Sequence, residues 1–225
     1  MQNHEKRIQD PAFAGSVASM SLGSDDVSES LDEAIAQASA NGIHFSVAAG
    51  NSDLDACKST PGSAALNTKN NVIVVGATTI TDDRADFSNF GDCTTLFAPG
   101  QDVTSTWIGS DIKINTISGT SMACPRMFTL PSSHSKQLLT NPLDVSGLIA
   151  YTLSQNPQLK TDTKGMKDFL VQSALDLTIK DPTQSKNTPD KDSKTVTVKL
   201  ANNGFTAPSV ATKRSIYTKR SIYHV

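Results

Sequence analysis

The sequence contains no apolar run close to the roughly 20 residues that a membrane-spanning helix requires. It also has no excess of charge: 20 Lys and Arg nearly balance 22 Asp and Glu, for a formal net charge of −2. The basic footprint of a nucleic-acid or anionic-membrane binder is therefore missing. The polar start MQNHEKRIQDPAF lacks the apolar middle of a signal peptide. We expect a monomer with no targeting signal in this chain and with no nucleic-acid or membrane partner.

Cysteine and histidine are also scarce. Three cysteines allow at most one intramolecular disulfide, and none of them forms a CxxC pair for zinc. The four histidines are widely separated and form no metal-ligand pair on one helix; they are His4, His44, His134 and His224. The sequence therefore argues against a disulfide scaffold and a zinc site, and we expect no cofactor.

The sequence does contain an ordered series of strands and helices. Runs of β-branched and small apolar residues predict strands over 16–22, 43–49, 71–78 and 94–100. Between the first two, a helix is expected with Asp25 or Asp26 as its N-cap and Asn41-Gly42 at its end. Strand, helix, strand at this spacing predicts a parallel sheet with crossover helices, which is an α/β fold.

The later part of the chain is less regular. Residues 102–109 and 113–118 predict a hairpin around Gly109-Ser110, and Met166–Leu175 predicts a helix with Phe169, Leu170 and Ala174 facing inward. Beyond about Asp181 the composition turns to Lys, Asp, Thr, Ser and Pro, which bury too little apolar surface to fold. We therefore expect residues 181–225 to form a mostly disordered tail, which ends in the exact duplication TKRSIYTKRSIY.

Ser121 is the first candidate for catalysis. It lies in GTSMACP, where Gly119 permits a tight turn and Thr120-Ser121 stand where a helix should begin. A hydroxyl nucleophile works best at a helix N-terminus, because free N–H groups there favour developing negative charge. Taken alone, the segment is explained more simply as an ordinary Ser/Thr-capped helix.

Asn51 is the second candidate. The segment VAAGNS (Val47 to Ser52) places an amide at the carboxyl end of a predicted buried strand. Open α/β sheets bind ligands at that edge, and an amide there can donate a hydrogen bond to an oxyanion. Taken alone, Gly50-Asn51 is explained more simply as a turn.

Together the two segments resemble one family. SMSLGS, GIHFSVAAGN, VGATTITDDRADFSNFG, FAPG and SGTSMACP occur in the order and rough spacing of the subtilisin-like serine proteases. They are most similar to the proteinase K branch and, within it, to the fungal vacuolar cerevisin type. The resemblance covers roughly Gly15 to Leu175. It implies a subtilisin-like three-layer α/β fold with a mostly parallel sheet, and a vacuolar or secreted serine endopeptidase that acts on polypeptides.

The resemblance also implies roles for individual residues. Ser121 matches the nucleophile that forms an acyl-enzyme, while Asn51 and the backbone N–H of Ser121 match the oxyanion donors. Ser21, Leu22 and Gly23 match the strand that pairs with an extended substrate. Three residues, Ala48, Ala49 and Gly50, match a wall of the primary specificity pocket. Peptide would then bind largely through its backbone, as an added strand.

Other residues acquire an expected role from the same resemblance. Cys57 and Cys93 match a disulfide of some relatives, with two structural thiols as the alternative, and Cys124 matches a buried free thiol beside the nucleophile. A calcium site common in that branch uses a carboxylate just before FAPG; Thr95 stands there instead, so we expect no calcium. His44, at the entry of a strand, matches a structural position and not a catalytic base.

The chain departs from the family in its first residues. The catalytic residues of these proteases run Asp, His, Ser, and the Asp and His motifs lie well upstream of the SLG strand. Only about twenty residues precede Ser21 here, with no Asp strand motif and no HGT segment. Triad members act as a unit, so losing one loses most of the rate. We expect residues 1–180 to form a partial catalytic domain, incomplete at its N-terminus and inactive as an isolated chain.

A second departure follows the nucleophile. The family reads roughly GTSMACPHVSGLIAY, whereas RMFTLPSSHSKQLLTNPLD (126–144) replaces the single His here. The codons of Arg126 and of Leu143-Asp144 can supply the GT and AG ends of an intron whose removal keeps the frame and restores that His. We therefore hypothesise that 126–144 is an aberrant insert.

Two prolines, Pro131 and Pro142, would break any helix through this segment. We expect the helix that carries Ser121 to end after about one turn. Downstream, we expect Leu148, Ile149 and Leu153 to lose their fixed register against the sheet.

Two other interpretations remain open. The chain can be a catalytically dead pseudoprotease that binds peptides through its SLG and AAG segments. It can also be a non-protease α/β hydrolase that pairs Ser121 with another base, for which only His134 is near in sequence.

Overall fold

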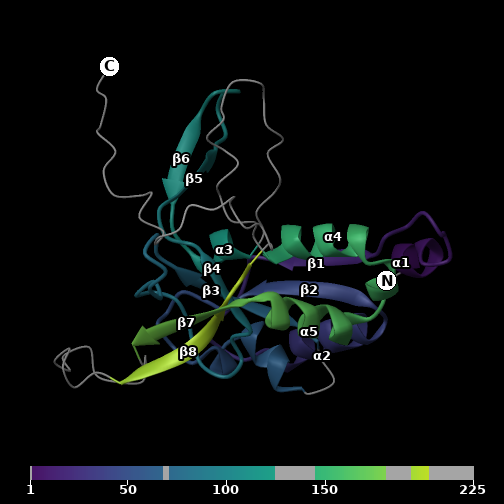
Figure 1. Cartoon of the computed structure of the whole chain (residues 1–225), viewed down its shortest axis with the longest axis horizontal. Helices are drawn as coiled ribbons and strands as arrows, with labels where there is room; N and C mark the ends of the chain where they lie inside the picture. The colour runs from purple at the N-terminus through teal and green to yellow at the C-terminus, as the bar shows by residue number, and fades with distance from the viewer. Residues whose placement is uncertain (1, 68–70, 125–144, 181–193, 203–225) are drawn as a thin grey trace.

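The computed structural model describes residues 2–67, 71–124, 145–180 and 194–202 (Figure 1). Within these ranges the elements in chain order are α1 (Gln2–Arg7), β1 (Ser16–Met20), α2 (Glu29–Ala40), β2 (Ile43–Ala48), η1 (Ala56–Lys58), η2 (Gly62–Leu66), β3 (Ile73–Thr78), β4 (Leu96–Pro99), β5 (Val103–Thr106), β6 (Ile114–Ile117), α3 (Thr120–Ala123), α4 (Val145–Gln155), η4 (Pro157–Leu159), α5 (Thr163–Ser173), β7 (Leu175–Lys180) and β8 (Thr195–Leu200).

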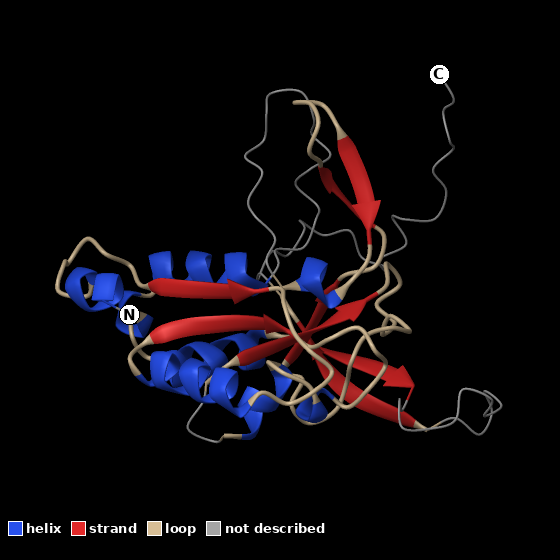
Figure 2. Cartoon of the chain, turned by 180° about the vertical axis from the view of Figure 1, so that it is seen from behind, coloured by secondary structure: helices blue, strands red, loops and turns tan. Residues whose placement is uncertain are grey.

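A six-stranded sheet in the order β1-β2-β3-β4-β8-β7 forms the centre of the structure. Strands β1 to β4 pair in parallel, β8 joins β4 in parallel, and β7 pairs antiparallel with β8. The predicted α/β fold with a mostly parallel sheet is confirmed. The predicted hairpin is also confirmed: β5 and β6 pair antiparallel and stand away from the sheet (Figures 1 and 2).

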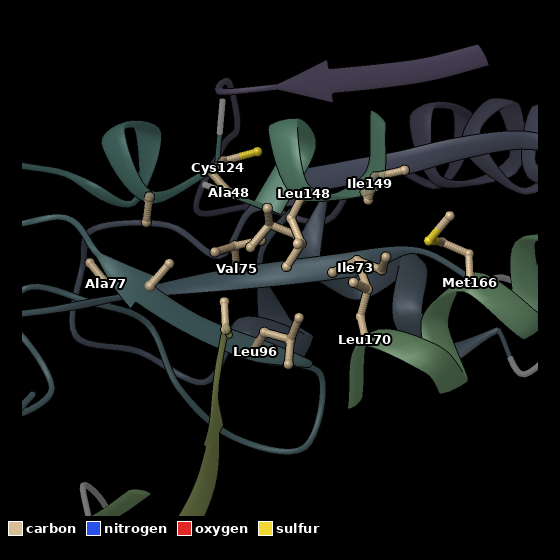
Figure 3. Packing of buried hydrophobic residues seen from close by; sticks show 14 of the residues in the cluster. Ala48, Ile73, Val75, Ala77, Leu96, Cys124, Leu148, Ile149, Met166 and Leu170 are labelled. Atoms are coloured by element: carbon tan, nitrogen blue, oxygen red, sulfur yellow. The ribbon is translucent and has the colours of Figure 1, made fainter. Parts of the chain in front are cut away.

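Helices cover both faces of the sheet. Along β3, Ile73 and Val75 contribute to a core with α3, α4 and α5, whereas Val74 contributes to a second core with α2. This division follows the period of two with which side chains alternate across a strand. Figure 3 shows the first core, in which Leu148 and Ile149 of α4 lie over β3. The sheet is therefore the middle of three layers.

Helix α2 begins later than the sequence predicts. Its N-cap is Ser28, not Asp25 or Asp26. The reason is that both aspartates belong to the preceding loop, where the Asp25 carboxylate accepts a hydrogen bond from Ser52 and the Asp26 N–H donates to Ser24. The predicted end is confirmed: Asn41 is the C-cap and Gly42 has a φ of +87°.

The inward face of α5 is only partly as predicted. Leu170 is buried and Ala174 packs against the first core, but Phe169 is 42% exposed. Asp162 caps the helix by accepting a hydrogen bond from the Gly165 N–H, so the helix begins at Thr163. Its buried face then carries Met166, one turn before Leu170, and Phe169 lies beside that face.

The expectation of a disordered tail over 181–225 is wrong for Thr195–Leu200, which forms β8. The segment TVTVKL pairs with β7 along its whole length, and Leu200 lies opposite Phe97 of β4. Alternation with β-branched residues is a strand signal that overall composition conceals. The duplicated TKRSIY segment lies outside the described residues. No helix in the described ranges is long and apolar enough to cross a membrane.

Candidate active site

The turn after β2 places Asn51 at the carboxyl edge of the sheet. Gly50 has a φ of +107°, and a Cβ there would lie 2.3 Å from the Asn89 Nδ2 atom. Only glycine permits both this backbone conformation and this approach. Asn89, in the segment RADFSNFG, therefore requires a glycine at position 50 of the AAGN segment.

Asn89 holds this turn together. Its Oδ1 atom accepts hydrogen bonds from the N–H groups of Ser52 and Leu54, both at 3.0 Å. Its Nδ2 atom donates to the Ala49 carbonyl at 2.9 Å and to Ser59 Oγ at 3.2 Å, and the side chain is fully buried. No local pattern in the sequence singles out Asn89, because an asparagine between Ser88 and Phe90 carries no signal of burial.

Asn51 itself is oriented by the first residue of α3. Its Oδ1 atom accepts hydrogen bonds from both the N–H and the Oγ1 of Thr120, each at 2.8 Å. Thr120 Oγ1 in turn accepts from the Gly50 N–H at 3.2 Å. Because two donors hold the carbonyl oxygen of the amide, its Nδ2 group is left to donate to an acceptor in the groove.

Ser121 follows directly and lies in the first turn of α3, as predicted. Its N–H group belongs to the set that an α-helix leaves without an intrahelical acceptor. Ser121 Oγ donates to the Ser21 carbonyl at 3.4 Å, and Ser21 Oγ donates to the Ser121 carbonyl at 3.1 Å. These two bonds join α3 to the end of β1. Gly119 is extended, with φ 161° and ψ 156°, so the expected tight turn is not what it provides.

The candidate residues meet in one groove of about 380 Å³. It is lined by Ser21, Leu22, Gly23, Ser24, Asp25, Ala48, Gly50, Asn51, Ser52, Thr60, Thr120 and Ser121. Ala49 does not line it, because its side chain belongs to the core on the α2 side of the sheet. The Ala49 N–H donates to the Val75 carbonyl, and the Ala49 carbonyl accepts from Asn89 Nδ2. We therefore leave Ala49 out of the substrate-binding set.

The described part of the chain brings no imidazole to Ser121. His44 is buried at the other end of β2, where its Nε2 atom lies 3.3 Å from the Lys160 carbonyl. Burial lowers the pKa of His44. His4 is buried between Ser16 Oγ and the Asn41 carbonyl, at 2.8 and 2.9 Å. The expectation that His44 is structural agrees with this geometry. His134 and His224 lie outside the described residues.

Cys124 is a buried free thiol at the end of α3, as expected. Its Sγ atom lies 3.3 Å from Ser46 Oγ, and burial raises the pKa of the thiol. A protonated, buried thiol is a poor nucleophile. The hydroxyl of Ser121 is therefore the more suitable nucleophile of the two.

Helix α4 resumes where α3 ends. The Ser146 N–H donates to the Cys124 carbonyl at 3.1 Å, and Ser146 Oγ donates to the same carbonyl at 2.8 Å. If a single residue stood between Pro125 and Val145, the first of these bonds would be the i→i−4 bond of one continuous helix. The two helices therefore hold the relative positions of consecutive turns.

This geometry corrects one expectation and confirms another. Helix α3 does end after four residues, as predicted. Leu148, Ile149 and Leu153 nevertheless keep their register, since they are 4%, 0% and 2% exposed within the first core. Their apolar face is fixed by packing against the sheet, which does not depend on a continuous backbone through 126–144.

The predicted Cys57–Cys93 disulfide is present. It links η1 to the segment before β4. Thr95, where the resemblance places a calcium ligand, accepts a hydrogen bond from the Val74 N–H through its hydroxyl. No group of three or more His, Cys, Asp or Glu side chains within the described residues can hold a metal ion.

A serine at the start of a helix, an oriented amide beside it and a groove at the carboxyl edge of a parallel sheet form an arrangement that suits a serine hydrolase. Comparison with known proteins narrows this class to one family. The model of the subtilase family (Peptidase_S8) matches residues 3–127, and the chain belongs to this family.

The chain is also similar to individual fungal proteases. It is 48% identical over 145 residues to subtilisin-like protease 8 of Arthroderma otae, covering 64% of this chain and 25% of that protein. It is 47% identical over 148 residues to subtilisin-like serine protease Pen ch 18 of Penicillium rubens (66% and 25%). Alkaline protease 2 of Aspergillus fumigatus is 42% identical over 163 residues (70% and 28%). These relatives are consistent with the proteinase K branch.

A solved structure shows the same fold. The crystal structure of a cold-adapted subtilisin-like serine proteinase is 33% identical, with a TM-score of 0.59, and the match covers 88% of this chain and 58% of that chain. The chain spans about a quarter of the length of the curated relatives it matches.

Proposed function

We propose that this chain is part of the catalytic domain of a serine endopeptidase that cleaves polypeptides through an acyl-enzyme on Ser121. The observation that carries the proposal is the double hydrogen bond from Thr120 to Asn51 Oδ1. It aims the amide N–H group into the groove that Ser121 lines. Asn51 and the Ser121 N–H then serve as preorganised donors to the tetrahedral intermediate. In a subtilisin, whose measured effect we adopt as the scale, removing such an amide lowers kcat about 10²–10³-fold.

Substrate binding uses the two segments that flank the groove. Ser21, Leu22 and Gly23 continue β1 and are exposed, so their backbone can pair with an extended peptide. Ala48 and Gly50 form the opposite wall. A peptide seated between them places its carbonyl carbon beside Ser121 Oγ. We propose that the protein acts on polypeptides as a monomer, without calcium or another cofactor.

We further propose that the isolated 225-residue chain binds peptides but turns them over very slowly. Within the described residues both histidines are buried and bonded elsewhere, so none can take the proton from Ser121 Oγ. An oxyanion site without a general base retains only a small part of the rate of a triad. On this basis the chain alone behaves as a peptide-binding pseudoprotease, although it descends from proteases.

The Cys57–Cys93 disulfide supports a location. Disulfides persist in oxidising compartments and are rare in the cytosol. We propose that the parent protein passes through such a compartment and is vacuolar or secreted.

Hydrolysis and binding measured on the same preparation test this proposal. The purified chain and its Ser121→Ala variant are incubated with a fluorogenic tetrapeptide amide, while fluorescence anisotropy reports binding of a labelled, uncleavable peptide. We expect both proteins to bind and neither to hydrolyse measurably. Hydrolysis that Ser121→Ala abolishes would show that the chain supplies its own base. A folded chain that binds no peptide would overturn the proposed function.

A further inference from the structure

One charged side chain lines the described part of the groove, and it comes from the loop that precedes α2, far from Ser121 in the sequence. Asp25 is the single ionisable residue among the described residues that line the groove; the others are small, hydroxylated, amide or aliphatic. The carboxylate is held in place, because its Oδ1 atom accepts a hydrogen bond of 2.7 Å from Ser52 Oγ. Ser52 follows Asn51 directly, so the carboxylate is fixed relative to the oxyanion donor.

No cation in the described part of the chain neutralises Asp25. The ion pairs there are Arg84–Asp53, Lys164–Asp168 and Lys199–Asp176. One hydrogen bond from a neutral hydroxyl leaves a carboxylate with most of its acceptor capacity unused. Within the described residues, the groove therefore combines a carboxylate that no cation pairs with a shape that admits a side chain between Ser21–Gly23 and Ala48–Gly50.

We infer that Asp25 is a specificity-determining residue that favours substrates with a lysine or arginine in this groove. The inference rests on the proposed function, in which the peptide carbonyl lies at Ser121 and Asn51. The side chain that precedes the scissile bond then enters the groove from that end, and a long basic side chain can carry its charge toward Ser52 and Asp25. The ammonium or guanidinium group pairs with the free acceptor sites of the carboxylate.

Binding to matched peptides tests this inference. The labelled peptides differ at one position, which carries arginine, citrulline or leucine; citrulline keeps the length and shape of arginine without its charge. We expect the full chain to bind the arginine peptide about three- to fivefold more tightly than the citrulline peptide, the range of an ion pair that solvent reaches. Added salt should reduce this preference, because screening acts on exposed charges.

The variant Asp25→Asn removes the charge and keeps the shape and an acceptor for Ser52. We expect it to bind the arginine and citrulline peptides equally. Asp26→Asn is the matched control, since Asp26 is the next residue, is exposed and does not line the groove. It should keep the preference for arginine. Thermal melting confirms that both variants are folded.

The outcomes separate the two proposals. Equal binding of arginine and citrulline peptides by the unmodified chain, or a preference that survives in Asp25→Asn, would overturn the role of Asp25 and leave peptide binding intact. A folded chain that binds none of the three peptides would overturn the proposed function together with this inference.

Discussion

The two halves of the site are held in different ways. The Asn51 corner, which comprises residues 49–59 with Asn89 and Cys93, is tied by four side-chain hydrogen bonds of Asn89 and by a disulfide. The α3–α4 junction, which comprises Thr120–Cys124 and Val145-Ser146, is tied by the hydrogen bonds of Ser146 to one carbonyl. The backbone around Asn51 is thus held mainly by groups within its own corner, whereas α3, which carries Ser121, is also bonded to chain that resumes beyond residue 144.

The largest effect is expected from opening the corner. The Cys57–Cys93 disulfide closes a loop with a sequence separation of 36. Loop-closure entropy predicts that Cys57→Ser with Cys93→Ser lowers the free energy of unfolding by about 4 kcal/mol. Urea denaturation measures the change. The variant Cys124→Ser, which replaces the free thiol among serine hydroxyls, is the control and should lose far less. A double variant as stable as this control would show that the corner does not depend on its disulfide.

The second largest effect is expected at the α3–α4 junction. Replacing Arg126–Asp144 with one histidine lets α3 and α4 form a continuous helix with the Ser146 to Cys124 bond in the i→i−4 position. Removing the closure entropy of a loop of this size should stabilise the protein by about 2–3 kcal/mol. For a chain of this length the melting temperature should rise by roughly 5–10 °C.

A two-residue replacement, His-Ala, provides a register control. The extra residue turns α4 by about 100° and moves Leu148 and Ile149 off the core. We expect this variant to be less stable than the one-residue variant and to have less helix by circular dichroism. Equal stability of the two would contradict the helix continuity that the junction implies.

The sequence predicts the central sheet because its strands are local patterns. Runs such as IHFSVA and IVVGAT are buried on both faces, and their β-branched residues are sufficient to place β2 and β3. Ser121 and Asn51 are predicted site residues for a different reason: each stands in a motif whose spacing resembles one family. Chemistry that depends on a motif is visible in sequence.

What escaped prediction depends on partners distant in the chain. Asn89 is decisive because it reaches Ala49, Ser52 and Leu54, and no local pattern reports such contacts. Asp25 lines the groove and does not cap α2, because its carboxylate accepts a hydrogen bond from Ser52, which lies 27 residues later. Strand β8 was missed because a polar composition outweighed the short alternation TVTVKL, which pairs with β7.

A smaller effect tests the contact that joins the two halves. Thr120→Val keeps the shape of the side chain and removes the hydroxyl that binds both Asn51 Oδ1 and the Gly50 N–H. Thr120 is fully buried, so the loss should cost about 1–2 kcal/mol in urea denaturation. Peptide binding should also weaken, because Asn51 loses one of the two donors that orient it. Thr120→Ser keeps the hydroxyl and is the control. A Thr120→Val protein with the stability and peptide affinity of this control would show that the Thr120 hydroxyl does not join the two halves of the site.

The smallest effect concerns the opposite end of β2, where His44 lies away from both halves of the site. Burial lowers the pKa of His44, so the folded state keeps the ring neutral where the unfolded chain, with a pKa near 6.5, already takes up a proton. Its contribution to stability is therefore complete above about pH 6.5 and is lost as the pH falls from there toward the lower pKa of the folded state. The slope from this group cannot exceed about 1.4 kcal/mol per pH unit. In His44→Gln, melting temperatures between pH 7.5 and 5.5 should fall less steeply than in the unmodified chain, with the difference at pH 8 reporting the cost of the substitution itself. Parallel curves would mean that His44 titrates alike in both states.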